Sequence, residues 1–255
     1  MKEAKSKTGI LMILGSLLVV FSMTAVSAYL KHLNEYDALT LCPKNRSYNH
    51  NVVIVDKTDP WQETDVESLK GLLKVSHANV KMNDRFTVKV IRSGSDGATE
   101  VNALFDLCNP GKESDANPLY QNPVKFRKKY QNKFDEPFSS LSEILTKSDV
   151  APKSPLLNVF VTTINESMGE NIELTIVSDL FENGDSYNFY EHIPQGTDWV
   201  LENEIKKTNV DIDIKYIDRQ SYRASAKDKV RQQWLEYFKH WNIHANQETF
   251  MKVKH

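Results

Sequence analysis

A short run of β-branched residues constrains the fold of this chain more than any other feature. Val52 to Val55 are all apolar, and the run ends at Asp56, with Thr58 and Asp59 close behind it. Because no polar residue alternates within the run, it predicts a strand buried on both faces, as in a parallel α/β sheet. Such sheets bind their ligands at the carboxyl ends of the strands. We therefore expect the chemistry of this chain at Asp56 and the residues that follow it.

Periodic patterns after this run predict alternating strands and helices. Apolar residues spaced by three and four predict helices, and apolar residues that alternate with polar ones predict strands. In chain order, the sequence predicts a strand at 52–55, a helix at 65–74, strands at 85–92 and 100–107, one or two helices within 123–145, a helix at 155–165, a strand at 173–180, a helix at 197–207, a strand at 210–217 and a helix at 226–243. This order is typical of an α/β fold with a doubly wound, mostly parallel, Rossmann-like sheet and helices on both faces.

One strand and one insertion depart from the parallel order. Residues 93–97 have the composition of a turn, so the strand at 100–107 is predicted to return as an antiparallel hairpin partner. The segment at about 109–153 is predicted to be an insertion, partly helical and broken or kinked near Pro137. It carries a basic group at Lys125, Arg127, Lys128 and Lys129. We interpret that group as a solvated helix face, with an anionic partner as the alternative.

The N-terminal segment predicts a membrane anchor. Residues 9–30 contain no charged residue, and about 20 apolar residues suffice for a helix to span a bilayer. Three lysines, Lys2, Lys5 and Lys7, precede the segment, so the positive-inside rule places the N-terminus in the cytoplasm. Cleavage of a signal peptide after Ala28 is the alternative.

This topology divides the chain into four parts. The predicted parts are a cytoplasmic tail at 1–8, a transmembrane signal-anchor at 9–30, a juxtamembrane stem at 31–50 and a folded domain at 51–255. The domain is expected outside the cytoplasm, and the lysine flanks with a short tail favour the periplasmic side of a bacterial inner membrane.

Two cysteines follow the anchor, Cys42 in the stem and Cys108 after the hairpin. Export to an oxidising compartment predicts a disulfide between them. The hairpin would also return Cys108 to the end of the sheet where the first strand starts, close to Cys42. Two unpaired thiols in a reducing compartment are the alternative.

Composition argues against several classes of function. The net charge of -2 disfavours a dedicated nucleic-acid binder. The seven histidines are scattered without the spacing of metal ligands. No nucleophile elbow and no phosphate-binding glycine loop is present in the sequence.

The order of elements and three polar positions resemble the von Willebrand factor A-type domain over about residues 51–243. In that family the central strand ends in Asp-x-Ser-x-Ser, a second loop supplies Thr or Ser, and the fourth strand ends in Asp. Together these residues form the metal-ion-dependent adhesion site. The matching positions here are Asp56-Lys57-Thr58-Asp59-Pro60, Ser154 and Asp179.

The resemblance implies a site for Mg²⁺ or Ca²⁺ that bridges to a carboxylate of a partner protein. Its implied ligands are Asp56, Thr58, Asp59, Ser154 and Asp179. Pro60 departs from the family because it has no side-chain oxygen where the family has its second serine, and Asp59 is the candidate replacement. Ser154 precedes Pro155, a pair typical of a helix start, so helix capping is the alternative role for Ser154.

Three functions follow as hypotheses. The first is a membrane-anchored interaction module, not an enzyme, that binds a protein of a membrane or envelope complex. The second is phosphoryl transfer, because Asp-Lys-Thr after an apolar strand also resembles haloacid-dehalogenase-like phosphatases; Asp56 would be the nucleophile, and Asp179 and Asp185 would hold Mg²⁺. The third is an anchored scaffold that acts without metal.

Overall fold

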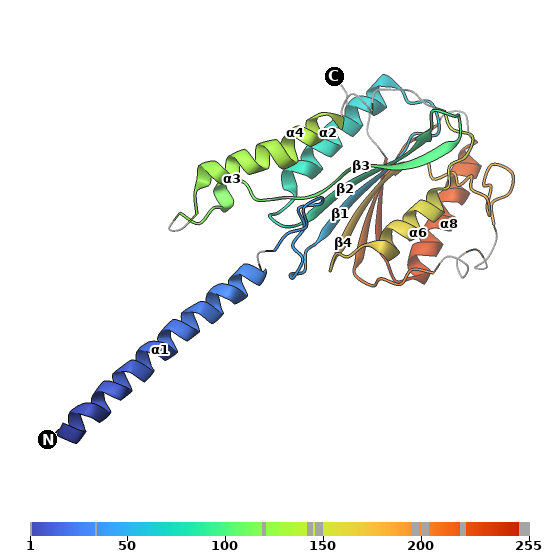
Figure 1. Cartoon of the computed structure of the whole chain (residues 1–255). Helices are drawn as coiled ribbons and strands as arrows, with labels where there is room; N and C mark the ends of the chain where they lie inside the picture. The colour runs from blue at the N-terminus through green and yellow to red at the C-terminus, as the bar shows by residue number, and fades with distance from the viewer. Residues whose placement is uncertain are drawn as a thin grey trace.

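The computed structural model shows a domain at the end of a long N-terminal helix (Figure 1). The described residues are 2–33, 35–118, 121–141, 145, 150–194, 199, 204–219 and 223–249. The domain is built on a six-stranded sheet with the strand order β3-β2-β1-β4-β5-β6. All neighbouring strands are parallel except β2 and β3, which form an antiparallel hairpin. The predicted fold class, including its one antiparallel strand, is confirmed.

The elements follow the predicted order closely. The strands are β1 (His50–Asp56), β2 (Arg85–Ser93), β3 (Thr99–Cys108), β4 (Ile172–Ser178), β5 (Val210–Tyr216) and β6 (His244–Thr249). The helices are α1 (Lys2–Leu33), α2 (Glu63–Asn79), α3 (Pro123–Tyr130), α4 (Glu136–Ser139), α6 (Leu156–Glu166) and α8 (Ala224–His240). Because β1 pairs with both β2 and β4, the strand order reverses at β1. The carboxyl end of β1 is therefore the switch point at which α/β sheets place their sites.

Two predictions about the last third of the chain need correction. The sequence analysis did not foresee β6, because its residues HANQET are polar and give no apolar alternation. Residues 204–207 are irregular, so the end of the predicted 197–207 helix is wrong. Trp199 is helical and buried, whereas 195–198 and 200–203 lie outside the described residues.

Helices cover the two faces of the sheet unequally. On one face, α6 and α8 pack over β1, β4 and β5 through residues such as Phe160, Trp234 and Ile214. On the other, α2 and the helical insertion cover the β1 and β2 side through residues such as Leu69 and Phe86. Alternation along β5 explains the difference, since Ile212 is buried on the first face while the neighbouring side chains are more exposed.

The insertion is helical and bent, as predicted. A π-helical turn at Gln131–Asp135 separates α3 from α4, and Pro137 lies in the first turn of α4. Proline has no amide hydrogen to donate to the preceding turn, and its ring needs extra space there. The wider turn provides that space. Phe134 within it is fully buried against His77 of α2, with ring centroids 4.5 Å apart.

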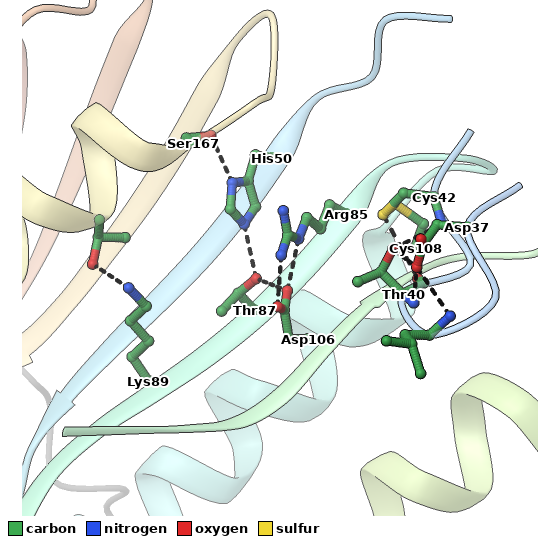
Figure 2. Close-up of polar contacts among 12 residues, drawn as sticks. Asp37, Thr40, Cys42, His50, Arg85, Thr87, Lys89, Asp106, Cys108 and Ser167 are labelled. Atoms are coloured by element: carbon green, nitrogen blue, oxygen red, sulfur yellow. Dashed lines mark hydrogen bonds and ion pairs between the residues drawn. A yellow bond between two sulfur atoms is a disulfide. The ribbon is translucent and has the colours of Figure 1, made fainter. Parts of the chain in front are cut away.

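The long helix α1 ends at a stem that is tied to the sheet. Residues 14–32 of α1 are long and apolar enough to cross a membrane, judged by length and composition. The stem is joined to the end of β3 by a disulfide between Cys42 and Cys108. Cys108 N–H also donates to the carbonyl of Thr40 at 2.7 Å (Figure 2). The hairpin thus returns Cys108 to the edge where β1 begins, as the sequence analysis expected.

Candidate functional site

Asp56 ends β1 at the carboxyl edge of the sheet and is only 5% exposed. Its Oδ1 accepts hydrogen bonds from the Thr58 hydroxyl at 2.6 Å and from the Thr58 amide at 3.1 Å. Such a local turn is typical of an aspartate that follows a strand. It fixes Thr58 beside the carboxylate, and both side chains are buried.

Two serines complete the hydrogen bonding of Asp56. Ser154 Oγ and Ser178 Oγ each donate to Asp56 Oδ2 at 2.9 Å. Ser154 is positioned by a two-way backbone pairing with Asn183, and Ser178 is the last residue of β4, the strand beside β1. Ser154 therefore binds Asp56 and does not cap α6, because Pro155 occupies the cap position without a side-chain bond.

Ser178 is a residue that sequence reasoning missed. The sequence analysis assigned the site residue at this strand end to its neighbour, Asp179. The available signal was strand register: β1 and β4 are parallel neighbours, and Val55 pairs with Val177. The residue after Val177 therefore lies next to Asp56.

Asp179 brings a second carboxylate to the same place. It is 4% exposed, and its Oδ1 accepts a hydrogen bond from the amide of Phe181 at 3.1 Å. Its Oδ2 has no hydrogen-bond partner among the described residues, and the Arg219 Nε lies 3.7 Å away. Burial raises the pKa of Asp179 well above its ordinary value, and the nearby charge of Asp56 raises it further. Arg219 offsets this effect only in part, so the buried carboxylate favours a proton or a cation.

Two surrounding side chains border the carboxylates. Arg219 Nη1 donates to the carbonyl of Pro60 at 2.6 Å, so Arg219 joins the loop after β1 to Asp179. Asp59 is half-buried, and its Oδ2 accepts a hydrogen bond from the Tyr190 hydroxyl at 3.3 Å. The charge of Asp59 contributes to the raised pKa of Asp179. Thr58 and Ser154 thus hydrogen-bond to Asp56, and Asp56 and Asp59 lie near enough to Asp179 to raise its pKa.

Glu182 is a further buried acid beside this cluster, and sequence reasoning missed it as well. It is 3% exposed, and its Oε2 accepts the amide of Leu157 at 2.6 Å. It therefore takes the capping role at the start of α6 that the sequence suggested for Ser154. Burial raises the pKa of Glu182 to about 8, against the opposing effect of that amide hydrogen bond.

The oxygen atoms around Asp56 and Asp179 are of the type that a small hard cation prefers. Mg²⁺ prefers oxygen ligands and keeps several waters, so one or two carboxylates with hydroxyl groups suffice. The described residues contain no group of three or more His, Cys, Asp and Glu side chains that could hold a metal. Hydroxyl groups would therefore have to contribute, and Thr58, Ser154 and Ser178 are in place. The Oδ2 of Asp179, which accepts no hydrogen bond among the described residues, is the observation that favours a cation.

Asp185, the third acid of the phosphoryl-transfer hypothesis, is exposed and does not join the buried acids. Its side chain is 88% exposed and forms an ion pair with Lys153. Asp56, the proposed nucleophile of that hypothesis, accepts hydrogen bonds at both of its oxygens. The structure therefore does not bring together the three acids that the phosphoryl-transfer hypothesis requires.

A second buried polar cluster lies at the opposite end of the sheet (Figure 2). His50 Nδ1 is 2.7 Å from Ser167 Oγ, and His50 Nε2 is 2.8 Å from Thr87 Oγ1. The Thr87 hydroxyl donates to Asp106, which also accepts two hydrogen bonds from Arg85 at 2.7 and 2.6 Å. We call these five residues the base network.

The hydrogen bonds of the base network show which atoms of His50, Thr87 and Ser167 carry protons. Since Thr87 gives its one hydrogen to Asp106, it accepts from His50 Nε2, and the other ring nitrogen accepts from Ser167. Burial lowers the pKa of His50 to about 3, so the ring is neutral, as this pattern requires. Among the described residues, each polar side chain of the base network has at least one hydrogen-bond partner within the network.

Comparison with known proteins finds similar solved structures. No family model and no curated protein matches the sequence. A von Willebrand factor type A protein from Catenulispora acidiphila is 12% identical with a TM-score of 0.40; the match covers 79% of this chain and 39% of that one. The conserved hypothetical protein BatB from Bacteroides thetaiotaomicron is 8% identical with a TM-score of 0.37, covering 78% of this chain and 90% of that one. An aerotolerance-related membrane protein from Bacteroides fragilis gives the same values.

These solved structures include the family that the sequence resembles. The identities and TM-scores are too low to transfer a function, and the chain spans well under half of the Catenulispora protein. The functional argument therefore rests on the residues of this chain.

Proposed function

We propose that this chain is a membrane-tethered interaction module that captures a partner protein through a divalent cation at the carboxyl edge of its sheet. The supporting observation is the buried Oδ2 of Asp179, which has no hydrogen-bond partner among the described residues. Asp56 lies close enough to raise the pKa of Asp179. A cation between the two carboxylates would remove their repulsion and leave a coordination position for a carboxylate of the partner.

The chain's own residues would prepare the cation site and control access to it. Asp56 and Asp179 would supply charge, and the hydroxyls of Thr58 and Ser154 would supply neutral oxygens after turning away from Asp56. Arg219 now lies between Asp179 and Pro60. Capture would require Arg219 to leave Asp179, because the cation and the guanidinium compete for the same carboxylate oxygen.

The position of the site suits a tethered receptor. Figure 1 shows α1 at one end of the domain, beside the start of β1, and the carboxyl ends of the parallel strands at the other end. With α1 as an uncleaved anchor, the cation site would face away from the membrane. The lysines in the first turns of α1, ahead of its apolar stretch, support a cytoplasmic N-terminus and a periplasmic domain.

We propose binding without catalytic turnover. The hydrogen bonds to both oxygens of Asp56 and the exposed position of Asp185 support this choice over phosphoryl transfer. Steady hydrolysis of a generic phosphomonoester, lost in Asp56→Asn, would contradict it.

Crosslinking of the full chain in its native membranes tests the capture. We expect partner adducts with Mg²⁺ present, and their loss on chelation or in Asp179→Asn, which keeps the shape of the side chain. Asp185→Asn is the matched control, since it removes an exposed acid near the same edge. Adducts that persist in Asp179→Asn and under chelation would sink the cation-bridged proposal and favour the metal-free scaffold.

A further inference from the structure

We propose that α3 docks on anionic lipid headgroups of the membrane in which α1 is anchored, and so orients the domain above the bilayer. The inference rests on the anchoring proposed above. It assigns a role to the basic residues of the insertion, which the cation site does not use. The bound surface would be the outward face of α3: Val124, Lys125 and Lys128.

Contacts through the stem place α3 close to the end of the anchor. Asn45 Nδ2 donates to the carbonyl of His32 at the end of α1, at 2.8 Å. Tyr36, between these two residues, donates its hydroxyl hydrogen to Asn83 Oδ1 at 3.2 Å. The Lys129 Nζ of α3 lies 4.9 Å from the centroid of the Tyr36 ring. Figure 1 shows the result: α3 lies at the end of the domain nearest α1.

The packing of α3 decides which of its residues face outward. Tyr130 lies against Phe134 with ring centroids 5.5 Å apart, and the Phe126 ring lies close to Gly111. Gly111 has a φ of +95°, and a side chain there would meet the Phe126 ring. Phe126 and Tyr130, four residues apart, therefore form the inner face of α3. Lys125 and Lys128 lie on the opposite face and are exposed.

This outer face combines cationic and apolar character. Every charged residue in α3 is basic, and Val124 is 44% exposed. Arg127 forms an ion pair with Glu113 at 3.2 Å, and Lys129 contacts Tyr36. Within the described part of the chain, no ion pair involves Lys125 or Lys128. A short basic helix with an exposed apolar residue is suited to an anionic bilayer surface.

The expected effect is large enough to measure. Each basic residue near an anionic leaflet favours the docked state by roughly fivefold, so replacing two of them with acidic residues should lower the docked-to-free ratio by at least roughly 30-fold. The attraction weakens with salt because mobile ions screen it. Lys125→Glu with Lys128→Glu leaves Arg127, Lys129 and the inner face unchanged, so the fold should survive.

The experiment uses the full chain reconstituted in vesicles. Val124→Trp provides a reporter on the outer face, and quenching by lipids brominated near the headgroup measures its contact with the bilayer. The chain without this substitution gives the background from its four native tryptophans. Vesicles of phosphatidylcholine alone are compared with vesicles that also contain phosphatidylglycerol. Arg223→Glu with Lys229→Glu is the charge-matched control at the start of α8, near the far edge of the sheet.

The proposal predicts strong quenching of the reporter only with phosphatidylglycerol. That quenching should fall with salt and in Lys125→Glu, Lys128→Glu, and should persist in the α8 control. Equal quenching in both vesicle types, or quenching unchanged by the two glutamates, would overturn it. No quenching in either vesicle type would also overturn the proposal. An acidic protein would then be the remaining candidate partner for the outer face of α3. Flotation of the chain with the vesicles separates these failures from failure of the anchor, because an unanchored chain would not float.

Discussion

The two ends of the sheet carry buried polar clusters that differ in whether they are complete. In the base network, hydrogen bonds join His50 to Ser167 and Thr87, and the carboxylate of Asp106 accepts two hydrogen bonds from the guanidinium of Arg85. At the carboxyl edge, Asp179 is more deeply buried than Asp106 and has an oxygen with no hydrogen-bond partner in the described structure. Buried polar groups are normally satisfied, so an exception requires an explanation.

This difference suggests that the base network stabilises the fold, whereas the cluster at the carboxyl edge binds a ligand. A closed network lowers the free energy of the folded state, and any change to it should reduce stability. An open one raises that free energy until a ligand completes it, so changes to it should affect ligand binding and the pH dependence of stability.

Breaking the base network should have the largest effect. Asp106→Ala removes the partner of the partly buried Arg85 and the acceptor of the buried Thr87 hydroxyl. We expect the free energy of unfolding to fall by about 3 kcal/mol, measured by denaturant unfolding of the full chain in detergent. Asp211→Ala, at a sheet aspartate whose side chain is 77% exposed, is the control and should change it by less than about 0.5 kcal/mol. Similar values for both variants would contradict the structural role of the base network.

Glu182 should make the carboxyl edge sensitive to pH. Its pKa rises from 4.5 to about 8 on folding, so the folded state binds the proton more tightly than the unfolded state. The resulting stabilisation is complete below pH 4.5 and is lost as the pH rises through about 8. We expect unfolding in chelator to show a loss of about 2 kcal/mol across this window, and Glu182→Gln to make the slope shallower.

The raised pKa of Asp179 has the same effect on stability in the wild type and in Glu182→Gln. A reduced slope of stability against pH therefore remains in the variant. Glu191→Gln, at an exposed position, should leave the slope unchanged. A wild-type stability that increases between pH 5 and 8 would contradict the account of Glu182.

Arg219 should weaken cation binding by a smaller amount. Its Nε lies 3.7 Å from Asp179 Oδ2, where its positive charge opposes a divalent cation. Arg219→Gln should tighten Mg²⁺ binding by about tenfold in calorimetry, since charges at this distance in a partly buried site interact appreciably. Arg223→Gln, which replaces an exposed arginine at the start of α8, should leave Mg²⁺ binding unchanged. Weaker binding in Arg219→Gln would show that Arg219 supports the site.

Sequence patterns predicted the strands well where one or both faces of the strand are buried. The apolar run of β1 and the alternation in β5 both identified strands, because those patterns follow from which faces are covered. Strand β6 was not predicted because its residues are polar and show no apolar alternation. Its place is set by pairing with β5, a contact that no local pattern encodes.

The candidate site was predictable in part for a similar reason. Asp56 and Asp179 follow apolar strands and are visible as strand ends. Ser178, Glu182 and Arg219 join the site through strand register and loop paths that bring distant segments together. The base network was missed altogether, because its members are spread over β1, β2, β3 and the end of α6, with nothing in their spacing to connect them.

Calorimetric titration of Mg²⁺ into the full chain in detergent micelles tests the central claim most directly. The account predicts one cation per chain for the wild type, none for Asp179→Asn and unchanged binding for Asp185→Asn. Binding to the wild type that vanishes in Asp179→Asn would establish the open cluster as a cation site, despite the loss of a ligand at Pro60. Equal binding by the wild type and Asp179→Asn, or no binding by either, would contradict it.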